Sequence, residues 1–297
     1  MKHRILIAFL FALAALVSFL LFFQKDTLKT FLPAAGDEES SPPTSLPKHQ
    51  VPPTQPTAQN GNRTGGGDFF SAKISFDLIK QKAESGDSSA QRELAEMYED
   101  CMSYSVSPEK SLKSLDYIST THPESRNRIE KIKKQTIDFC RNVDGGQPIP
   151  AVAYQLWLER SAESGDLVAE IRQSVRGANG LDQGKLKDLS RKVMDSKNPE
   201  ALYELSNILG RQEVQWETEE DSRIFGSRYS QNAMAIAACR AGMNCGPDSR
   251  LMRLVCTSTF RCNYQNYEQY VYAELTTPAE RREVENIASM ISSKFPH

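Results

Sequence analysis

Histidine is scarce in this chain, and the few copies lie far apart. Of four histidines, only His122 falls within the part with a folded pattern, since His3 and His49 precede residue 68 and His297 ends the sequence. Catalytic triads, Cys-His pairs and multi-histidine metal sites all need histidine beside other reactive groups. The sequence therefore predicts no catalytic site of these kinds, no metal site and no cofactor. We interpret His122, which directly precedes a proline, as a turn residue.

A dominant charge of one sign is also missing. Lysine and arginine number 36 and aspartate and glutamate 38, for a net charge of −2. Proteins that bind nucleic acid usually present a strongly basic face, so no nucleic-acid partner is expected. An acidic run at Glu217, Glu219, Glu220 and Asp221 could receive a cation or a basic peptide, but we interpret it as a solvated loop.

Polar side chains are nearly absent from Ile5 to Phe23, where Ser18 is the one exception. At about 1.5 Å per residue, this run nearly spans a hydrocarbon core of roughly 30 Å. A cleaved signal peptide usually has a shorter apolar run and a small-x-small site, and Pro33-Ala34-Ala35 matches that site poorly. Residues 1–23 are therefore predicted to be an N-terminal membrane anchor, with a cleaved signal and secretion as the alternative.

Large apolar residues are rare between residues 24 and 67, which are rich in Pro, Ser and Thr. Such a segment cannot bury enough apolar surface to order itself. We expect a disordered linker that tethers the rest of the chain to the membrane.

Cysteine is absent from the first 100 residues, and all six copies follow the predicted anchor. An even set in this position favours disulfides in an oxidising compartment. Zinc ligation and free thiols are the alternatives, although zinc ribbons normally use tighter spacing. The expected disulfide cysteines are Cys101, Cys140, Cys239, Cys245, Cys256 and Cys262.

The pairing of these cysteines is not fixed by the sequence, because six cysteines allow fifteen connectivities. Our working hypothesis joins Cys101 to Cys140. It further joins Cys239 to Cys256 and Cys245 to Cys262, as links between two short helices across a turn.

The remaining chain shows helical spacing of apolar residues and no convincing two-residue alternation. The sequence Ala-Glu-Ser-Gly-Asp occurs at residues 83–87 and again at 162–166. We interpret each copy as a corner between helices, in which the glycine takes the left-handed conformation and the aspartate caps the next helix. A degenerate third corner follows at Asn198 and Pro199, and Ala201 takes the place of Ala90 and Ala169.

These corners resemble the Sel-one-like repeat, a relative of the tetratricopeptide repeat that builds helical solenoids. The first copy carries the resemblance most fully, although Gln173 and Lys197 depart from the pattern in the later copies. The matching residues are Ala83, Gly86, Asp87, Ala90, Leu94, Ala95 and Tyr98. Such repeats usually serve as adaptor or scaffold surfaces, so the resemblance implies protein binding.

The predicted fold class is all-α, an irregular helical-hairpin repeat domain with disulfides. We expect an anchor at 1–23, a linker at 24–67, the repeat region at 68–225 and a cysteine-rich helical cap at 226–297. This layout also resembles uncharacterised cysteine-containing envelope proteins of gammaproteobacteria. It implies a single-pass protein of the bacterial inner membrane whose C-terminal domain lies in the periplasm.

Aromatic residues supply the candidate binding site. The candidate binding residues are Trp216, Tyr264, Tyr267 and Tyr270. We interpret the tyrosines as core packing, and a groove that stacks on a ligand is the alternative. The predicted function is a scaffold that binds another envelope protein and has no catalytic activity. The alternative is a protein that binds or cleaves peptidoglycan, for which Glu124 in a Glu-Ser pair is the candidate acid.

Overall fold

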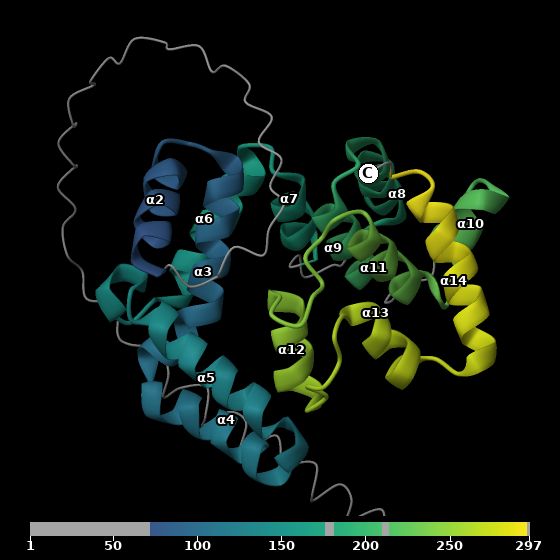
Figure 1. The fold of residues 1–297 in the computed structure, drawn as a ribbon. Helices are drawn as coiled ribbons and strands as arrows, with labels where there is room; N and C mark the ends of the chain where they lie inside the picture. Colours follow the sequence, from purple (N-terminus) through teal and green to yellow (C-terminus); the bar gives the residue numbers. More distant parts are fainter. Residues whose placement is uncertain (1–71, 176–180, 210–213, 296–297) are drawn as a thin grey trace, which may run out of the picture. The chain divides into compact units, whose positions relative to one another are not determined.

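The computed structural model describes residues 72–175, 181–209 and 214–295, and within these ranges all regular structure is helical. Thirteen α-helices and no strand occur in the described residues, which confirms the all-α prediction (Figure 1). The predicted anchor, residues 1–23, and the predicted linker, residues 24–67, lie outside the described part of the chain. None of the described helices combines the length and the apolarity needed to cross a bilayer.

The helices follow one another as α2 (Ala72–Glu84), α3 (Ser88–Val106), α4 (Pro108–Thr121), α5 (Arg126–Cys140), α6 (Ala151–Glu163), α7 (Leu167–Ser174), α8 (Gln183–Ser196), α9 (Pro199–Leu209), α10 (Glu219–Phe225), α11 (Ser230–Arg240), α12 (Arg250–Thr259), α13 (Tyr267–Tyr270) and α14 (Pro278–Ser292). Short turns of other helix types are η1 (Pro123–Ser125), η2 (Val143–Gly146) and the π-helical η3 (Val271–Leu275).

The first predicted corner joins α2 to α3 as the sequence indicates. Gly86 has a φ of +96°, in the left-handed region, and the amide of Asp87 donates to the carbonyl of Lys82 over 3.1 Å. The Asp87 side chain then accepts a hydrogen bond from the amide of Ala90 over 2.9 Å. Both predicted roles, the left-handed glycine and the capping aspartate, are confirmed.

The second and third corners repeat this geometry. Gly165 has a φ of +90°, and the Asp166 side chain caps α7 through the amide of Ala169 over 2.8 Å. At the third corner Lys197 takes the left-handed conformation, with a φ of +54°, and Asn198 accepts from the amide of Ala201 over 3.1 Å. The turn therefore keeps the same conformation although lysine stands in the place of glycine.

The helices that follow the three corners are α3, α7 and α9, and each buries its alanine. Ala90, Ala169 and Ala201 are all buried, which permits close approach of neighbouring helices. Helix α3 packs against α6, and α7 packs against α9 (Figure 1). The Ser161 hydroxyl also donates to the carbonyl of Ser88 over 2.8 Å, which links the end of α6 to the start of α3.

The apolar interior consists of three clusters. One cluster lies among α2, α3, α5 and α6 and includes Leu94 and Leu158; a larger one runs from Val168 to Phe295. The larger cluster continues across residue 225, the boundary expected between repeat region and cap. A third, small cluster lies between the α4–α5 hairpin and the Cys256 and Cys262 side chains.

All six cysteines form disulfides. Cys101 is joined to Cys140, as predicted, with 5.3 Å between the Cα atoms. The bond connects α3 to the end of α5 and therefore closes the segment that contains the α4–α5 hairpin.

The predicted pairing of the other four cysteines is wrong. Cys239 is joined to Cys245, and Cys256 is joined to Cys262. In each case a residue with positive φ ends the helix between the two cysteines, Gly242 at +105° and Phe260 at +63°. Because the chain reverses there, the second cysteine returns to the helix that holds the first.

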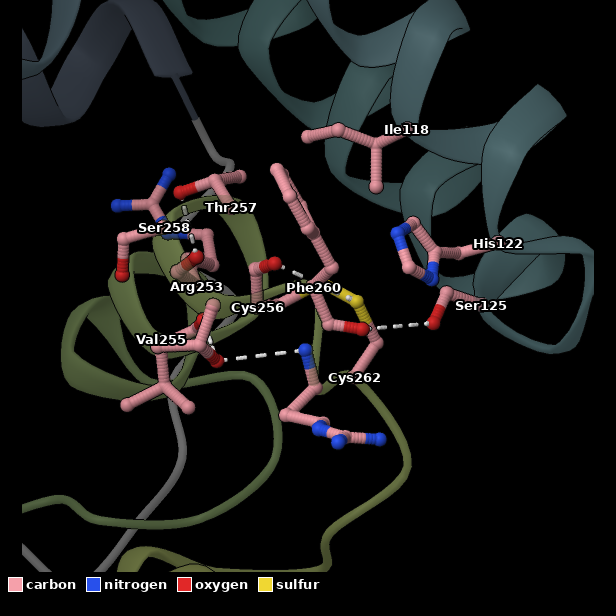
Figure 2. Close-up of a disulfide and its surroundings, with 12 residues drawn as sticks. Ile118, His122, Ser125, Arg253, Val255, Cys256, Thr257, Ser258, Phe260 and Cys262 are labelled. Carbon is pink, nitrogen blue, oxygen red and sulfur yellow. Dashed lines mark hydrogen bonds between the residues drawn. A yellow bond between two sulfur atoms is a disulfide. The ribbon is translucent and has the colours of Figure 1, made fainter.

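The loop closed by Cys256 and Cys262 touches the α4–α5 hairpin through Phe260. Figure 2 shows the His122 ring beside the Phe260 ring, with ring centroids 4.9 Å apart. In the same view the Ser125 hydroxyl donates to the Phe260 carbonyl over 3.2 Å. His122 lies at a turn, as predicted, and this turn helps to position the C-terminal end of α12.

Removing the Cys101–Cys140 disulfide is expected to cost more stability than removing either short-range disulfide. The long bond has a sequence separation of 39 and each short one of 6. The loop-entropy relation then gives losses of about 4 and about 2 kcal/mol respectively for double Cys→Ala variants. Denaturant unfolding under oxidising conditions measures the difference, and equal losses would contradict this ranking.

Replacing Gly86 by alanine should lower the free energy of unfolding by about 1 kcal/mol, because alanine tolerates the left-handed conformation poorly. A Cβ atom added there meets no atom within 4 Å, so the loss is conformational and not steric. Glu84→Ala, at the exposed end of α2, serves as the control and should change stability by less than about 0.5 kcal/mol. Thermal or urea unfolding measures both, and a neutral Gly86→Ala variant would refute the corner assignment.

Candidate functional site

A concave surface lies where α3, α7 and α9, the helices that follow the three corners, meet α12. Its larger hollow has a volume of ≈ 540 Å³ and is lined by residues of these helices and by Tyr154 of α6. A second hollow of ≈ 200 Å³ shares Arg172, Tyr203 and Arg250 with the first. We name the two adjoining hollows the charged cleft. The helices that follow the three corners therefore supply three walls of the charged cleft.

Arg92, in α3, is the first of the arginines that organise the charged cleft. Its guanidinium group lies 3.2 Å from Asp166, 2.8 Å from Glu200 and 3.1 Å from Glu96. Asp166 caps α7 with its other carboxylate oxygen, and Glu200 lies in the first turn of α9. One side chain of α3 thus contacts the beginnings of both later helices.

Arg172, in α7, adds ion pairs to carboxylates of both α3 and α9. It pairs with Glu96 of α3 at 2.7 Å and with Glu204 of α9 at 2.6 Å. Arg172 and Glu204 occupy equivalent positions, each three residues after the buried alanine of its helix. The repeat therefore places opposite charges side by side on successive helices.

Helix α12, in the C-terminal part of the chain, completes the network of ion pairs. Arg250 pairs with Glu99 at 2.7 Å and with Asp100 at 2.9 Å, and Arg253 pairs with Asp100 at 2.9 Å. These contacts join residues about 150 positions apart in the sequence. They hold α12 against α3 and make it the fourth wall of the charged cleft.

The ion pairs keep Glu96 and Arg172 charged in spite of their burial. Burial opposes ionisation of Glu96, but the guanidinium groups of Arg172 and Arg92 outweigh burial, so its pKa lies below its ordinary value. Burial likewise opposes the charge on Arg172, while Glu204 and Glu96 more than compensate and raise its pKa. The arginines are therefore fixed cations whose charge is taken up by neighbouring carboxylates.

Apolar side chains open to solvent at the edge of the charged cleft. Val175 is 45% exposed and Leu254 is 49% exposed, and both line the larger hollow. Tyr154, Ile171 and Ile208 lie deeper in the same lining. Exposed large apolar groups that converge on one concave surface are typical of binding sites.

The predicted tyrosines form a cluster beside the charged cleft and are absent from its lining. Tyr264 and Tyr267 each contact Tyr270, with ring centroids 5.7 and 5.9 Å away. Tyr270 is buried, and burial raises the pKa of Tyr267. Tyr267 also packs edge-on against Tyr203, at 6.4 Å, and Tyr203 does line the cleft. The predicted cluster therefore supports a cleft residue that was not predicted.

Trp216 lies apart from the tyrosines, at a hollow of ≈ 710 Å³ beside α8 and α10. Its ring packs on Phe225, with centroids 4.9 Å apart, and its indole nitrogen is buried without a hydrogen-bond partner. A Cβ atom added at Gly226 would come within 2.9 Å of the ring. Trp216 is thus tightly packed against this turn.

The acidic run beside Trp216 is partly helical and partly paired. Glu219, Glu220 and Asp221 form the first turn of α10, which Thr218 caps. Lys187 pairs with Glu217 at 3.2 Å, and Lys294 pairs with Glu220 at 2.6 Å. The interpretation as a solvated loop therefore holds only for Glu217, since the other acidic residues begin a helix.

Glu124 is the candidate acid of the enzymatic alternative and lies in η1. Its carboxylate is 3.4 Å from the Nδ1 atom of His122. The adjacent Ser125 is buried and contacts the Phe260 carbonyl (Figure 2). Elsewhere in the described ranges, no group of three histidine, cysteine, aspartate or glutamate side chains is arranged to hold a metal ion.

Comparison with known protein families, with curated proteins and with solved structures finds no match.

Sequence reasoning missed the charged cleft because its partners are distant in the chain. The spacing that relates Arg172 to Glu204 was available, as both follow a buried alanine by three residues. Nothing local, however, indicates that Arg250 and Arg253 of α12 meet α3.

Replacing Arg172 by methionine is expected to destabilise the protein by about 3 to 5 kcal/mol, because it leaves Glu96 and Glu204 buried without their shared cation. Lys113→Met provides the control, since Lys113 pairs with Glu109 on the exposed face of α4. That loss should stay below about 1 kcal/mol.

The Arg172→Met loss should also depend on pH. The depressed pKa of Glu96 means that its ion pairs stabilise the fold above its ordinary pKa of 4.5 and that this contribution is lost as the pH falls below that value. The difference between wild type and variant should therefore shrink as the pH falls below 4.5 and close only below the depressed pKa of Glu96. Urea unfolding at pH 7 and at low pH tests this, and a pH-independent difference would contradict it.

Proposed function

We propose that this chain is a non-catalytic protein-binding scaffold, tethered to the bacterial inner membrane through residues 1–23, whose helical domain binds another envelope protein in the periplasm. The observation that carries the proposal is the charged cleft. It combines exposed apolar side chains with a fixed set of charges, and both kinds of group serve protein recognition.

The construction of the cleft supports binding more than chemistry. Its arginines are engaged by carboxylates of α3 and α9 and by the residue that caps α7, so they hold the walls in place. Walls that are already rigid lose little further entropy when a partner binds. The resemblance of the corners to Sel-one-like repeats points the same way, since such repeats usually present adaptor surfaces.

The cysteines support the proposed compartment. Each of the six is paired, and structural disulfides persist mainly in oxidising environments such as the periplasm. Together with the apolar run at Ile5 to Phe23, this favours a domain held outside the cytoplasm. Secretion after cleavage of the N-terminal segment is the alternative with the same compartment.

Photocrosslinking in intact cells tests the proposal. A photoreactive amino acid at Val175 or at Leu254 of the full-length chain should give the same protein adduct, because both side chains lie at the cleft. The control is the same amino acid at Tyr117, which is exposed on α4 and should give no such adduct. Mass spectrometry identifies the adducts.

Recovery of peptidoglycan fragments alone from the two cleft positions would favour the alternative, a protein that binds or cleaves peptidoglycan. Loss of a wall-cleaving activity in a Glu124→Gln variant that remains folded would establish the enzymatic form of that alternative. An adduct formed equally from all three positions would refute specific binding in the cleft.

A further inference from the structure

Among the residues that the structure describes, the charges of the cleft are unequal in number. Its lining contains the three arginines Arg92, Arg172 and Arg250, and it contains five carboxylates. These are Glu96, Glu99, Asp100, Glu200 and Glu204. Adding the adjacent pairing groups, Arg253 and Asp166, leaves the same excess of two negative charges.

The charges are also unequal in exposure. The side chains of Arg92, Arg172 and Arg250 are 11%, 16% and 22% exposed, so their donors are directed into the protein. Glu99 is 39% exposed and Glu200 is 50% exposed. An entering ligand therefore meets carboxylate oxygens first and would have to break internal ion pairs to reach a guanidinium group.

Glu99 and Glu200 lie in different parts of the cleft. Glu99 lines the larger hollow and Glu200 lines the smaller one, on either side of the shared Arg172 and Arg250. The exposed side chains Val175 and Leu254 line the larger hollow together with Glu99, and Leu254 also lines the smaller hollow with Glu200. The site thus offers two separate anionic positions and an exposed apolar surface.

We propose that the charged cleft binds an extended peptide segment of the partner protein that carries two basic side chains and an apolar side chain. The inference rests on the proposed function, because it names the kind of segment that the scaffold takes. One lysine or arginine would pair with Glu99 and another with Glu200, while the apolar residue would cover Val175 and Leu254. Partly desolvated carboxylates favour such cations and disfavour anionic segments.

The test uses the purified full-length chain in detergent and three fluorescein-labelled peptides. The peptides share one sequence of Leu, Ser and Gly and differ at two positions, which are both Lys, both Gln or both Glu. Fluorescence anisotropy at low salt is expected to show the Lys peptide binding at least about tenfold more tightly than the Gln peptide. The difference should shrink at high salt, where exposed charges are screened.

A double variant, Glu99→Gln with Glu200→Gln, should remove the advantage of the Lys peptide and improve binding of the Glu peptide, because Arg250 and Arg92 each lose a carboxylate partner. Glu109→Gln, on the exposed face of α4, is the matched control and should leave all three affinities unchanged. Circular dichroism and thermal unfolding confirm that each variant is folded.

Equal affinity for the Lys and Gln peptides, or a preference for the Glu peptide, would overturn this proposal. If Val175 and Leu254 still gave a shared protein adduct in cells, the scaffold function would stand without it. Absence of binding by every peptide, with that adduct retained, would also overturn it and indicate a folded surface as the occupant. Absence of peptide binding together with absence of the shared protein adduct would refute the scaffold function itself.

Discussion

The buried guanidinium group of Arg92 is the constraint on which the rest of the domain depends. An unpaired guanidinium at this depth would cost several kcal/mol, so the helices must bring carboxylates to it. Two of these are Asp166 and Glu200, which stand at the beginnings of α7 and α9. Because Asp166 also caps α7, its position fixes both the helix start and the ion pair. The corners are therefore assembled around a shared charge as well as an apolar core.

The same ion pairs that hold the helices together also set the charge of the cleft. Each arginine in the cleft satisfies carboxylates from neighbouring helices, and the carboxylates outnumber the arginines. Glu99 and Glu200 are paired with Arg250 and Arg92, and among the carboxylates of the described lining they are the most exposed to solvent. The ion pairs that hold the walls of the cleft in place thus also leave its more exposed charges negative.

Features set by local chemistry could be predicted from the sequence, and those set by distant contacts could not. Gly86 with Asp87 specifies a corner within a few residues, and Asn198 with Pro199 begins α9 as the sequence indicates. The pairing of Cys256 with Cys262 was missed because Phe260, a residue that rarely adopts positive φ, makes the reversal. The charged cleft was missed because α12 meets α3 only through tertiary packing.

The missed disulfide and the missed cleft share a physical origin. The Cys256–Cys262 bond closes the loop at the end of α12, and Phe260 in that loop stacks on His122 while its carbonyl accepts from Ser125 (Figure 2). At its other end the same helix is held by the pairing of Arg250 with Glu99. Helix α12 is thus fixed at both ends, by a covalent loop and by ion pairs. Since α12 is one wall of the charged cleft, the shape of the binding surface depends on the oxidised state of a disulfide that lies outside it.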